Sequence, residues 1–367
     1  MQGKTMIARL LCFCFACFFS FVVQAADFSV TFINPGGKTG FWGEVSRAMK
    51  AAAIDLDADL EILYADRQPY AMEELLQQRL EQGNLPDYFV LVNENQAGAR
   101  LMQLMAGQPS KVFFLLNRLT LQQRTILESR SIDLHNIVGS VVPDNEIAGY
   151  EMALSLFEKV QEREPENKAI RLLALTGDTT TPAGLQRELG MLRAVADHRN
   201  VRLVHAIPVN WDEETAYQRT RDVLARTQVD VVWAANDAIA FGAQSAARGA
   251  DLVPGKDILF AGLNWSQRGM QAVREQTMTM THGGHFFAGA WALVMLRDHF
   301  FRGYDGEVVV NVLFKMSPIR SDNVGLYLSR LGDGNWDKID FAQFGKSING
   351  NSHYDFSAKA ILAAAGS

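Results

Sequence analysis

Cysteine is nearly absent from this 367-residue chain, and the three that occur lie close together, at Cys12, Cys14 and Cys17. All three fall within residues 1–26, a segment that we expect the mature protein to lose. The mature chain would then have no cysteine, which excludes disulfides. A chain of this length folds without them because it can bury a large hydrophobic core.

The first 26 residues follow the pattern of a secretory signal peptide. They contain the basic residues Lys4 and Arg9 and no acidic residue, and they continue with the apolar run Leu10–Val23, which is short for a membrane span. Small residues at the end of the run predict cleavage near Ala25 or Ala26 and export to the periplasm. The alternative is an uncleaved membrane anchor. No second long apolar run follows.

Clusters of basic residues are missing as well. The chain has 35 Lys and Arg against 41 Asp and Glu, a net charge of −6, and no stretch concentrates the positive charges. Proteins bind nucleic acids and anionic membranes through such basic stretches, so the sequence predicts neither of them as a partner.

Catalytic motifs are missing too. There is no GxSxG, no HExxH and no GxGxxG after a strand, and the GKT of the loop 35–43 lacks the first glycine of a phosphate-binding loop. His282 and His285 have no third ligand at a useful spacing, so we predict neither a metal nor a cofactor. An exported hydrolase stays open as an alternative because carboxylates and histidines are available.

What the chain does have is a regular alternation of strand-like and helix-like segments, about 30 residues apart. This spacing is typical of βα units in a parallel sheet, and it predicts an α/β fold. The alternation of strands and helices starts again after residues 138–150, and we interpret this segment as a crossing between two lobes. The predicted strands are Phe28–Ile33, Leu60–Ala65, Tyr88–Val92, Val112–Leu116, Ile137–Val141, Ile170–Leu175, Val201–Ile207, Val229–Ala234, Ile258–Leu263, Thr277–Thr281 and Val308–Phe314.

Polar side chains follow many of these strands directly. Because the carboxyl ends of parallel strands meet at one edge of a sheet, and ligands bind at that edge, we expect these residues to converge on one site. Each also has a structural alternative: Trp42 can belong to the core, Asp237 can cap a helix, and Arg187 can form a surface ion pair. The candidates are Asn34, Phe41, Trp42, Asn93, Asn117, Arg118, Arg187, Asn236, Asp237, Asn264, Trp265 and His282.

The candidate residues follow one another in the order that is typical of a known family. Through them, the chain from about Phe28 to Phe314 resembles the type I periplasmic sugar-binding proteins of the ribose-binding kind. The resemblance implies two Rossmann-like lobes joined by a three-segment hinge, with a small polar ligand held between them at the residues above. It implies lobes of 27–141 plus 283–307 and of 142–282 plus 308–322, leaving 323–367 as an extension.

The same resemblance implies that the lobes close on the ligand and that a membrane protein then recognises the closed form. The predicted partner is the permease of an ABC importer, and the alternative is a sensor kinase or chemoreceptor. A monomer is expected.

Three positions depart from the usual family pattern. Asn117 and Asn264 stand where sugar binders commonly have aspartate, and His282 stands where glutamine is frequent. Carboxylates accept hydrogen bonds from sugar hydroxyls, so amides in their place change the balance of donors and acceptors in the pocket. A modified sugar, a sugar-like signal or another small polar molecule therefore stays open as the ligand.

Overall fold

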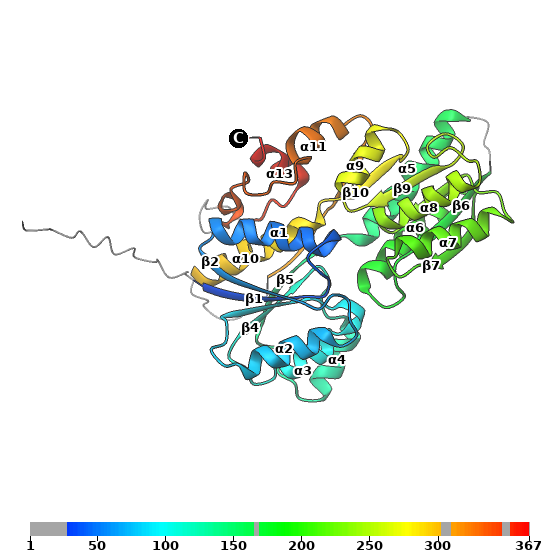
Figure 1. Cartoon of the computed structure of the whole chain (residues 1–367). Helices are drawn as coiled ribbons and strands as arrows, with labels where there is room; N and C mark the ends of the chain where they lie inside the picture. Colours follow the sequence, from blue (N-terminus) through cyan, green and yellow to red (C-terminus); the bar gives the residue numbers. More distant parts are fainter. Residues whose placement is uncertain (1–27, 165–168, 302–309, 347–352, 367) are drawn as a thin grey trace, which may run out of the picture.

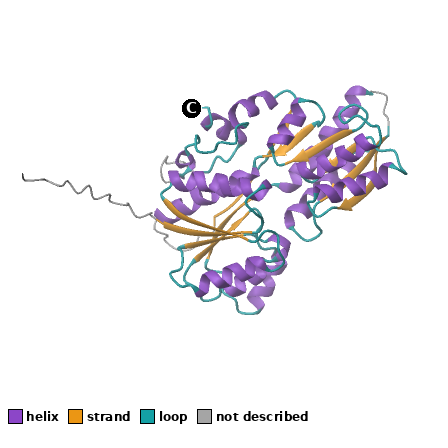
Figure 2. Cartoon of the chain, in the orientation of Figure 1, coloured by secondary structure: helices purple, strands orange, loops and turns teal. Residues whose placement is uncertain are grey.

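The computed structural model describes residues 28–164, 169–301, 310–346 and 353–366. The predicted signal peptide lies outside this part of the chain. The described residues form two lobes, each built on a six-stranded sheet with helices packed against it (Figures 1 and 2). Among these residues, no helix combines the length and the hydrophobicity needed to cross a lipid bilayer.

The first lobe has an entirely parallel sheet in the order β11-β5-β4-β3-β1-β2. Helices α1 and α10 cover one face of this sheet, and α2, α3 and α4 cover the other (Figure 1). The strands are β1 Phe28–Asn34, β2 Ala58–Tyr64, β3 Tyr88–Leu91, β4 Lys111–Leu115, β5 Ile137–Pro143 and β11 Val310–Phe314. The helices are α1 Gly40–Asp55, α2 Ala71–Glu81, α3 Gly98–Leu104, α4 Leu121–Ser129 and α10 Ala288–Phe301.

The second lobe has the order β12-β10-β9-β8-β6-β7, and β12 at its edge is antiparallel to β10. The strands are β6 Ile170–Thr176, β7 Val201–Pro208, β8 Val231–Ala234, β9 Leu259–Leu263, β10 Met280–Gly283 and β12 Ser317–Arg320. The helices are α5 Asn145–Arg163, α6 Pro182–Asp197, α7 Glu213–Leu224, α8 Asp237–Gly249 and α9 Gln267–Arg274.

The sequence explains why these elements form. The four residues of β8 are all buried, as expected for an apolar run in the middle of a parallel sheet. Helices α5 and α8 begin at side chains that accept a hydrogen bond from the first helical turn: Asp144 from the Ile147 N–H at 3.0 Å and Asn236 from the Ile239 N–H at 2.8 Å.

One part of the predicted lobe division is wrong. Residues 308–322 were assigned to the second lobe, but β11 pairs with β5 in the first sheet, and only β12 joins the second. The apolar pattern of β11 marks it as a strand without saying which sheet it joins. The chain therefore crosses between the lobes after β5, after β10 and between β11 and β12.

The extension beyond residue 322 adds a further crossing. Helix α11, Val324–Leu331, packs on α9 of the second lobe, whereas the short helix η3, Phe341–Phe344, packs on α1 and α10 of the first. An aromatic cluster anchors the extension, with Trp291 and Phe356 stacked at 4.6 Å between ring centroids. The last helix is α13, Ala358–Ala364, so the extension touches both lobes.

Candidate functional site

A cleft between the two lobes is the candidate binding site. It contains about 480 Å³ of empty space, part of it open to solvent. Both lobes supply its walls, mostly from residues just after strands or in the first turns of helices. The lining residues are Phe41, Trp42, Arg67, Glu94, Leu116, Asn117, Pro143, Thr181, Ala183, Arg187, Trp211, Asn236, Asn264 and His285.

Aromatic rings form part of each wall. Phe41 stacks on the His285 ring with 4.4 Å between centroids and meets Trp42 edge-on at 5.2 Å. On the second lobe, the guanidinium of Arg187 lies 5.6 Å from the ring centre of Trp211. Such rigid apolar surfaces suit the C–H faces of a cyclic polar ligand.

Arg187 is the most buried charge in the cleft, with 4% of its surface exposed. Its guanidinium donates to Asn145 Oδ1 and to the Ala235 carbonyl, both at 2.9 Å, and lies 3.3 Å from His285 Nε2. Burial lowers the pKa of Arg187 to about 10, and the charge of Glu94 partly offsets this effect. The side chain is therefore held in one orientation by neutral acceptors.

Two glycines bring Arg187 to this place. A Cβ at Gly149 of α5 would lie 2.0 Å from the Arg187 carbonyl oxygen, and one at Gly190 of α6 would lie 1.9 Å from the Glu146 carbonyl oxygen. Only glycine allows α5 and α6 to approach so closely, and this approach puts Arg187 against Asn145.

Glu94 is the acidic side chain of the cleft. It is buried, and its carboxylate lies 3.6 Å from the guanidinium of Arg67. Burial raises the pKa of Glu94 to about 7, against the opposing charges of Arg67 and Arg187. Glu94 can therefore change its charge near neutral pH.

Hydrogen bonds between the lobes hold the cleft shut. Asn95 of the first lobe accepts a hydrogen bond from the Thr180 hydroxyl at 3.1 Å, and its N–H donates to the Thr181 hydroxyl at 3.3 Å. Asn117 Oδ1 accepts from the Ala183 N–H at 3.1 Å. These bonds reach the first turn of α6 and its loop, so the structure is a closed form.

The cleft asparagines have one end occupied and one end free. Asn117 and Asn236 each use the side-chain oxygen to accept a backbone N–H at a helix start. Within the described chain, the amide nitrogen of neither has a partner. Asn264 joins them at the lip of the cleft, where its φ of 151° turns the chain after β9.

Not all predicted site residues line the cleft. Phe41, Trp42, Asn117, Arg187, Asn236 and Asn264 do. Asn34 and Asn93 are buried inside the first lobe and close their own loops: Asn34 bonds to Trp42 O, Ser46 and Gly36, and Asn93 bonds to Arg118 O, Gln123 and Gly98. The side chain of Arg118 is exposed outside the cleft.

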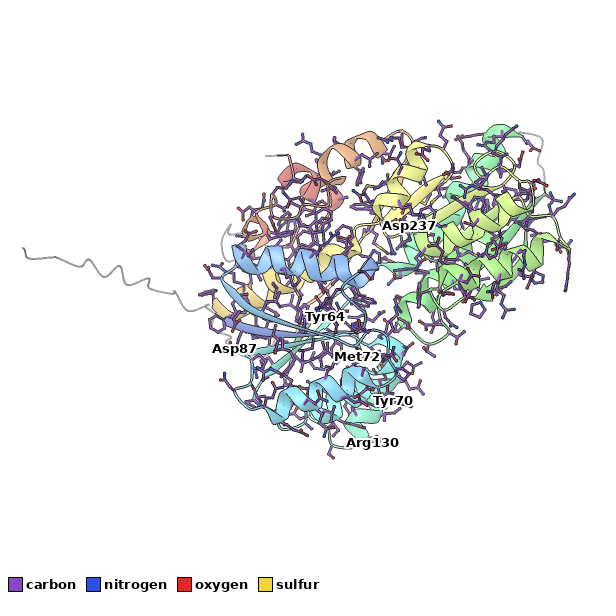
Figure 3. The ribbon with its side chains drawn as sticks, in the orientation of Figure 1. Tyr64, Tyr70, Met72, Asp87, Arg130 and Asp237 are labelled. Atoms are coloured by element: carbon purple, nitrogen blue, oxygen red, sulfur yellow. The ribbon has the colours of Figure 1, made fainter. Side chains whose placement is uncertain are left out.

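His282, Asp237 and Trp265 have partners away from the cleft. His282 is 1% exposed, and its Nε2 lies 2.8 Å from Glu151 of α5. Asp237 lies at the end of the second lobe that faces the first (Figure 3) and accepts from Ser266 and Thr281. Trp265 donates from Nε1 to the Ser317 carbonyl at 2.8 Å.

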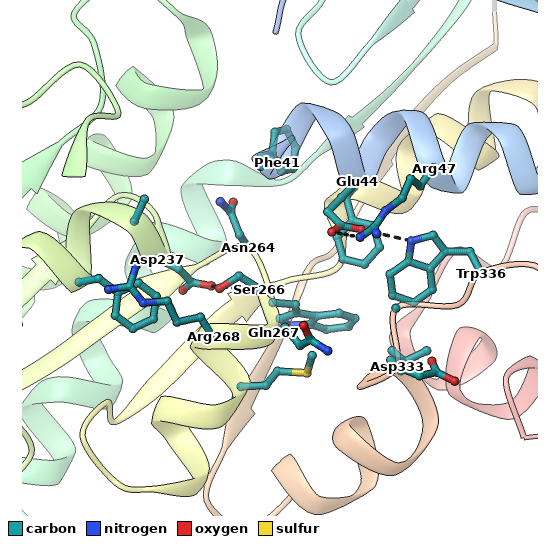
Figure 4. A pocket seen from close by; sticks show the side chains of 18 of the residues that line it. Phe41, Glu44, Arg47, Asp237, Asn264, Ser266, Gln267, Arg268, Asp333 and Trp336 are labelled. Carbon is teal, nitrogen blue, oxygen red and sulfur yellow. Dashed lines mark hydrogen bonds and ion pairs between the residues drawn. The ribbon is translucent and has the colours of Figure 1, made fainter. Parts of the chain in front are cut away.

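Asp237 and Trp265 instead line a second cavity, which we call the outer cavity (Figure 4). It lies between α1, the second lobe and the extension, and it has about 960 Å³ of empty space, part of it open to solvent. Its residues are Gly40, Phe41, Glu44, Arg47, Glu213, Asp237, Ala238, Phe241, Asn264, Trp265, Ser266, Gln267, Arg268, Met270, Phe286, Leu331, Asp333, Gly334 and Trp336.

Sequence reasoning missed several cleft residues: Arg67, Glu94, Thr181, Trp211 and His285. Glu94 belongs to the stretch VNEN, which follows a strand, so its position indicated a candidate site residue. From that stretch, however, Asn93 was predicted as the site residue. His285 was considered only as a metal ligand. Among the described residues, no group of three or more metal-binding side chains occurs.

Two lobes, a hinge and a polar cleft define a two-lobed α/β binding protein. The chain matches the family described as periplasmic binding protein domain over residues 30–302. It therefore belongs to the periplasmic binding protein family, and its fold is the type I fold of periplasmic sugar-binding proteins. A comparison with curated proteins gave no match.

Solved structures agree with this assignment. A periplasmic sugar-binding protein from Pseudomonas fluorescens is 35% identical, with a TM-score of 0.81, and the match covers 91% of this chain and 99% of that one. The myo-inositol-binding protein of Caulobacter, bound to myo-inositol, is 20% identical, with a TM-score of 0.68 and coverage of 83% and 97%. A solute-binding protein of an Actinobacillus succinogenes ABC transporter, bound to D-allose, is 19% identical, with a TM-score of 0.68 and coverage of 82% and 99%.

Proposed function

We propose that this chain is an exported solute-binding protein that closes its lobes on a small polyhydroxylated ligand and presents it to an ABC importer. The observation that carries the proposal is the cleft itself, in which Arg187, Asn117 and Asn236 keep hydrogen-bond donors without partners. Unpaired donors in a closed cleft cost free energy, and a ligand with hydroxyl or carbonyl oxygens removes that cost. The Pseudomonas fluorescens relative, described as sugar-binding, supports the same class of ligand.

Closure converts binding into a change of shape. The ligand adds contacts to both walls and so favours the closed form that the Asn95 and Asn117 bonds already stabilise. The permease would then recognise the surface that both lobes form together. Catalysis is not part of the proposal, and we expect the ligand to leave unchanged.

Thermal unfolding of the purified mature protein with a panel of sugars, polyols and sugar derivatives tests the proposal. A ligand present at 100 times its dissociation constant stabilises the folded state by about 2.7 kcal/mol, which raises the melting temperature by several degrees. Mass spectrometry of molecules that co-purify with the protein would identify the natural ligand. A flat response to the whole panel, with no co-purified ligand, would count against the proposal.

A further inference from the structure

The polar groups of the cleft are mostly hydrogen-bond donors. The side-chain oxygens of Asn117 and Asn236 accept hydrogen bonds from backbone N–H groups, and their NH₂ groups stay free. The guanidinium of Arg187 has five N–H bonds, and three acceptors surround it. At least two of its N–H bonds therefore stay available.

His285 keeps the guanidinium of Arg187 in place as a neutral acceptor. Its Nε2 faces the Arg187 guanidinium, which can only donate, so Nε2 must accept and the proton must sit on Nδ1. Burial, helped by the charge of Arg187, lowers the pKa of His285 well below its ordinary value, which keeps the ring neutral. Nδ1 is buried and has no hydrogen-bond partner in the described structure.

The charge of Arg187 is also only partly balanced. Among the described residues, no carboxylate lies within ion-pair distance of it, and its contacts are a side-chain amide, a carbonyl and an imidazole. Glu94 is the one acidic residue among the described residues that line the cleft, and it pairs with Arg67 instead. The charged side chains that line the cleft are two arginines and one glutamate, and the charge of Glu94 only partly offsets the cost of burying Arg187, so the cleft favours a ligand that brings a negative group.

We propose that the ligand is a sugar acid, a polyhydroxylated molecule whose single carboxylate is received by the buried guanidinium of Arg187 and the neighbouring amide of Asn236. This inference rests on the proposed function and narrows its ligand class. The usual aspartates of sugar binders accept hydrogen bonds from hydroxyl groups. Here the amide of Asn117, whose oxygen accepts the Ala183 N–H, reverses that role, and a ligand with extra acceptors matches the reversal.

Matched ligand pairs that differ only in the acid group give the direct test. Isothermal titration calorimetry of the mature protein compares D-galacturonate with D-galactose, D-glucuronate with D-glucose, and D-gluconate with sorbitol. At least one acid should bind about 100-fold or more tightly than its neutral counterpart, because sites that depend on a charged hydrogen bond discriminate strongly against analogues that lack it. Glucose 6-phosphate and galactose 1-phosphate serve as doubly charged competitors and should bind weakly.

The variant Asn117→Asp sharpens the test without disturbing the fold. The aspartate keeps the oxygen that accepts the Ala183 N–H and replaces only the free NH₂ group by a second oxygen. We expect it to weaken binding of the acid by about tenfold or more and to affect binding of a neutral sugar much less, because a second carboxylate repels the acid. Arg268→Gln in the outer cavity serves as the control and should leave both affinities unchanged.

The outcomes separate the two proposals. If neutral sugars bind as tightly as their acids, or only the phosphates bind, the sugar-acid inference is overturned while the solute-binding function stands. If Asn117→Asp strengthens binding of the acid, the inference is overturned as well. If no member of any pair binds, the sugar-acid inference is overturned, and the solute-binding function is then decided by the wider ligand panel and by the molecules that co-purify with the protein.

Discussion

The cleft and the outer cavity lie next to each other and share Phe41 and Asn264, but their charged groups are in different states. In the outer cavity, Arg268 pairs with Glu213 at 2.9 Å and covers the Phe241 ring at 3.8 Å. In the cleft, Arg187 has only neutral partners.

The outer cavity satisfies its other polar groups too. Glu44 forms an ion pair with Arg47 and accepts from Trp336 Nε1, as the dashed lines in Figure 4 show. The outer cavity has the larger volume, yet it offers a polar ligand few unsatisfied groups. The comparison indicates that unsatisfied buried groups, and not volume, mark a binding site.

Replacing the two arginines is the strongest test of this comparison. Arg187→Met should weaken ligand binding by about 30-fold or more, because truncating one partner of a buried charged pair typically costs 2–5 kcal/mol. Arg268→Met should change the affinity less than twofold. Titration calorimetry measures the ligand affinity of both variants, and circular dichroism checks their folding. Equal losses of affinity would contradict the difference between the cleft and the outer cavity.

Removing Trp336 tests whether the outer cavity is structural. Trp336 is 6% exposed and packs against Phe286 at 5.1 Å and Phe287 at 5.0 Å. Trp336→Ala should lower the free energy of unfolding by about 3 kcal/mol, the usual cost of deleting a buried aromatic ring. Chemical denaturation measures this loss. The ligand affinity should stay within about threefold, and a much larger drop would mean that the outer cavity takes part in binding.

The charge of Glu94 makes both stability and binding depend on pH. Because the folded protein raises its pKa to about 7, the stabilisation is complete below the ordinary value of 4.5 and is lost as the pH rises through 7. The melting temperature should therefore fall between pH 5 and pH 8. Glu94→Gln should flatten this slope, and a slope that the variant leaves unchanged would contradict the role of Glu94.

Binding of a sugar acid should follow the same titration. Below pH 7 a protonated Glu94 no longer repels the ligand, so affinity should rise by up to about tenfold per pH unit between pH 8 and pH 6. Three neighbouring groups keep their charge in this range. Arg187 stays positive and His285 stays neutral; burial raises the pKa of Asp178, but its hydrogen bonds from Thr181 and Trp211 outweigh this and keep that pKa low. An affinity that rises with pH would contradict this role of Glu94.

The smallest expected effect is at the bonds between the lobes. Asn95→Ala removes the acceptor for Thr180 and should weaken ligand binding about fivefold, mostly through faster dissociation, since one such hydrogen bond contributes about 1 kcal/mol. Gln267→Ala removes a comparable bond to the Gly332 carbonyl in the outer cavity and should leave the dissociation rate unchanged. Stopped-flow fluorescence measures both rates.

The fold could be predicted because the alternation of strands and helices is a local property of the sequence. The placement of β11 could not be predicted, since its pairing with β5 joins residues about 170 positions apart. The lobe to which such a strand belongs depends on the path of the chain after α10, and no local pattern encodes that path.

The site was predicted only in part, for a similar reason. A polar residue after a strand can turn into the cleft or back into its own loop, and Asn93 and Glu94 show the two outcomes in neighbouring positions. His282 and His285 differ in the same way, because the chain leaves β10 at Gly283 and Gly284, whose positive φ angles redirect it. One side chain then meets Glu151, and the other meets Arg187.

The extension has a mechanical consequence. Because its α11 end packs on the second lobe and its η3 end packs on the first, the extension links the two lobes in addition to the three crossings between them. A fourth link of this kind limits how far the lobes can move apart. Solution scattering should therefore show only a slight gain in the radius of gyration when the ligand leaves.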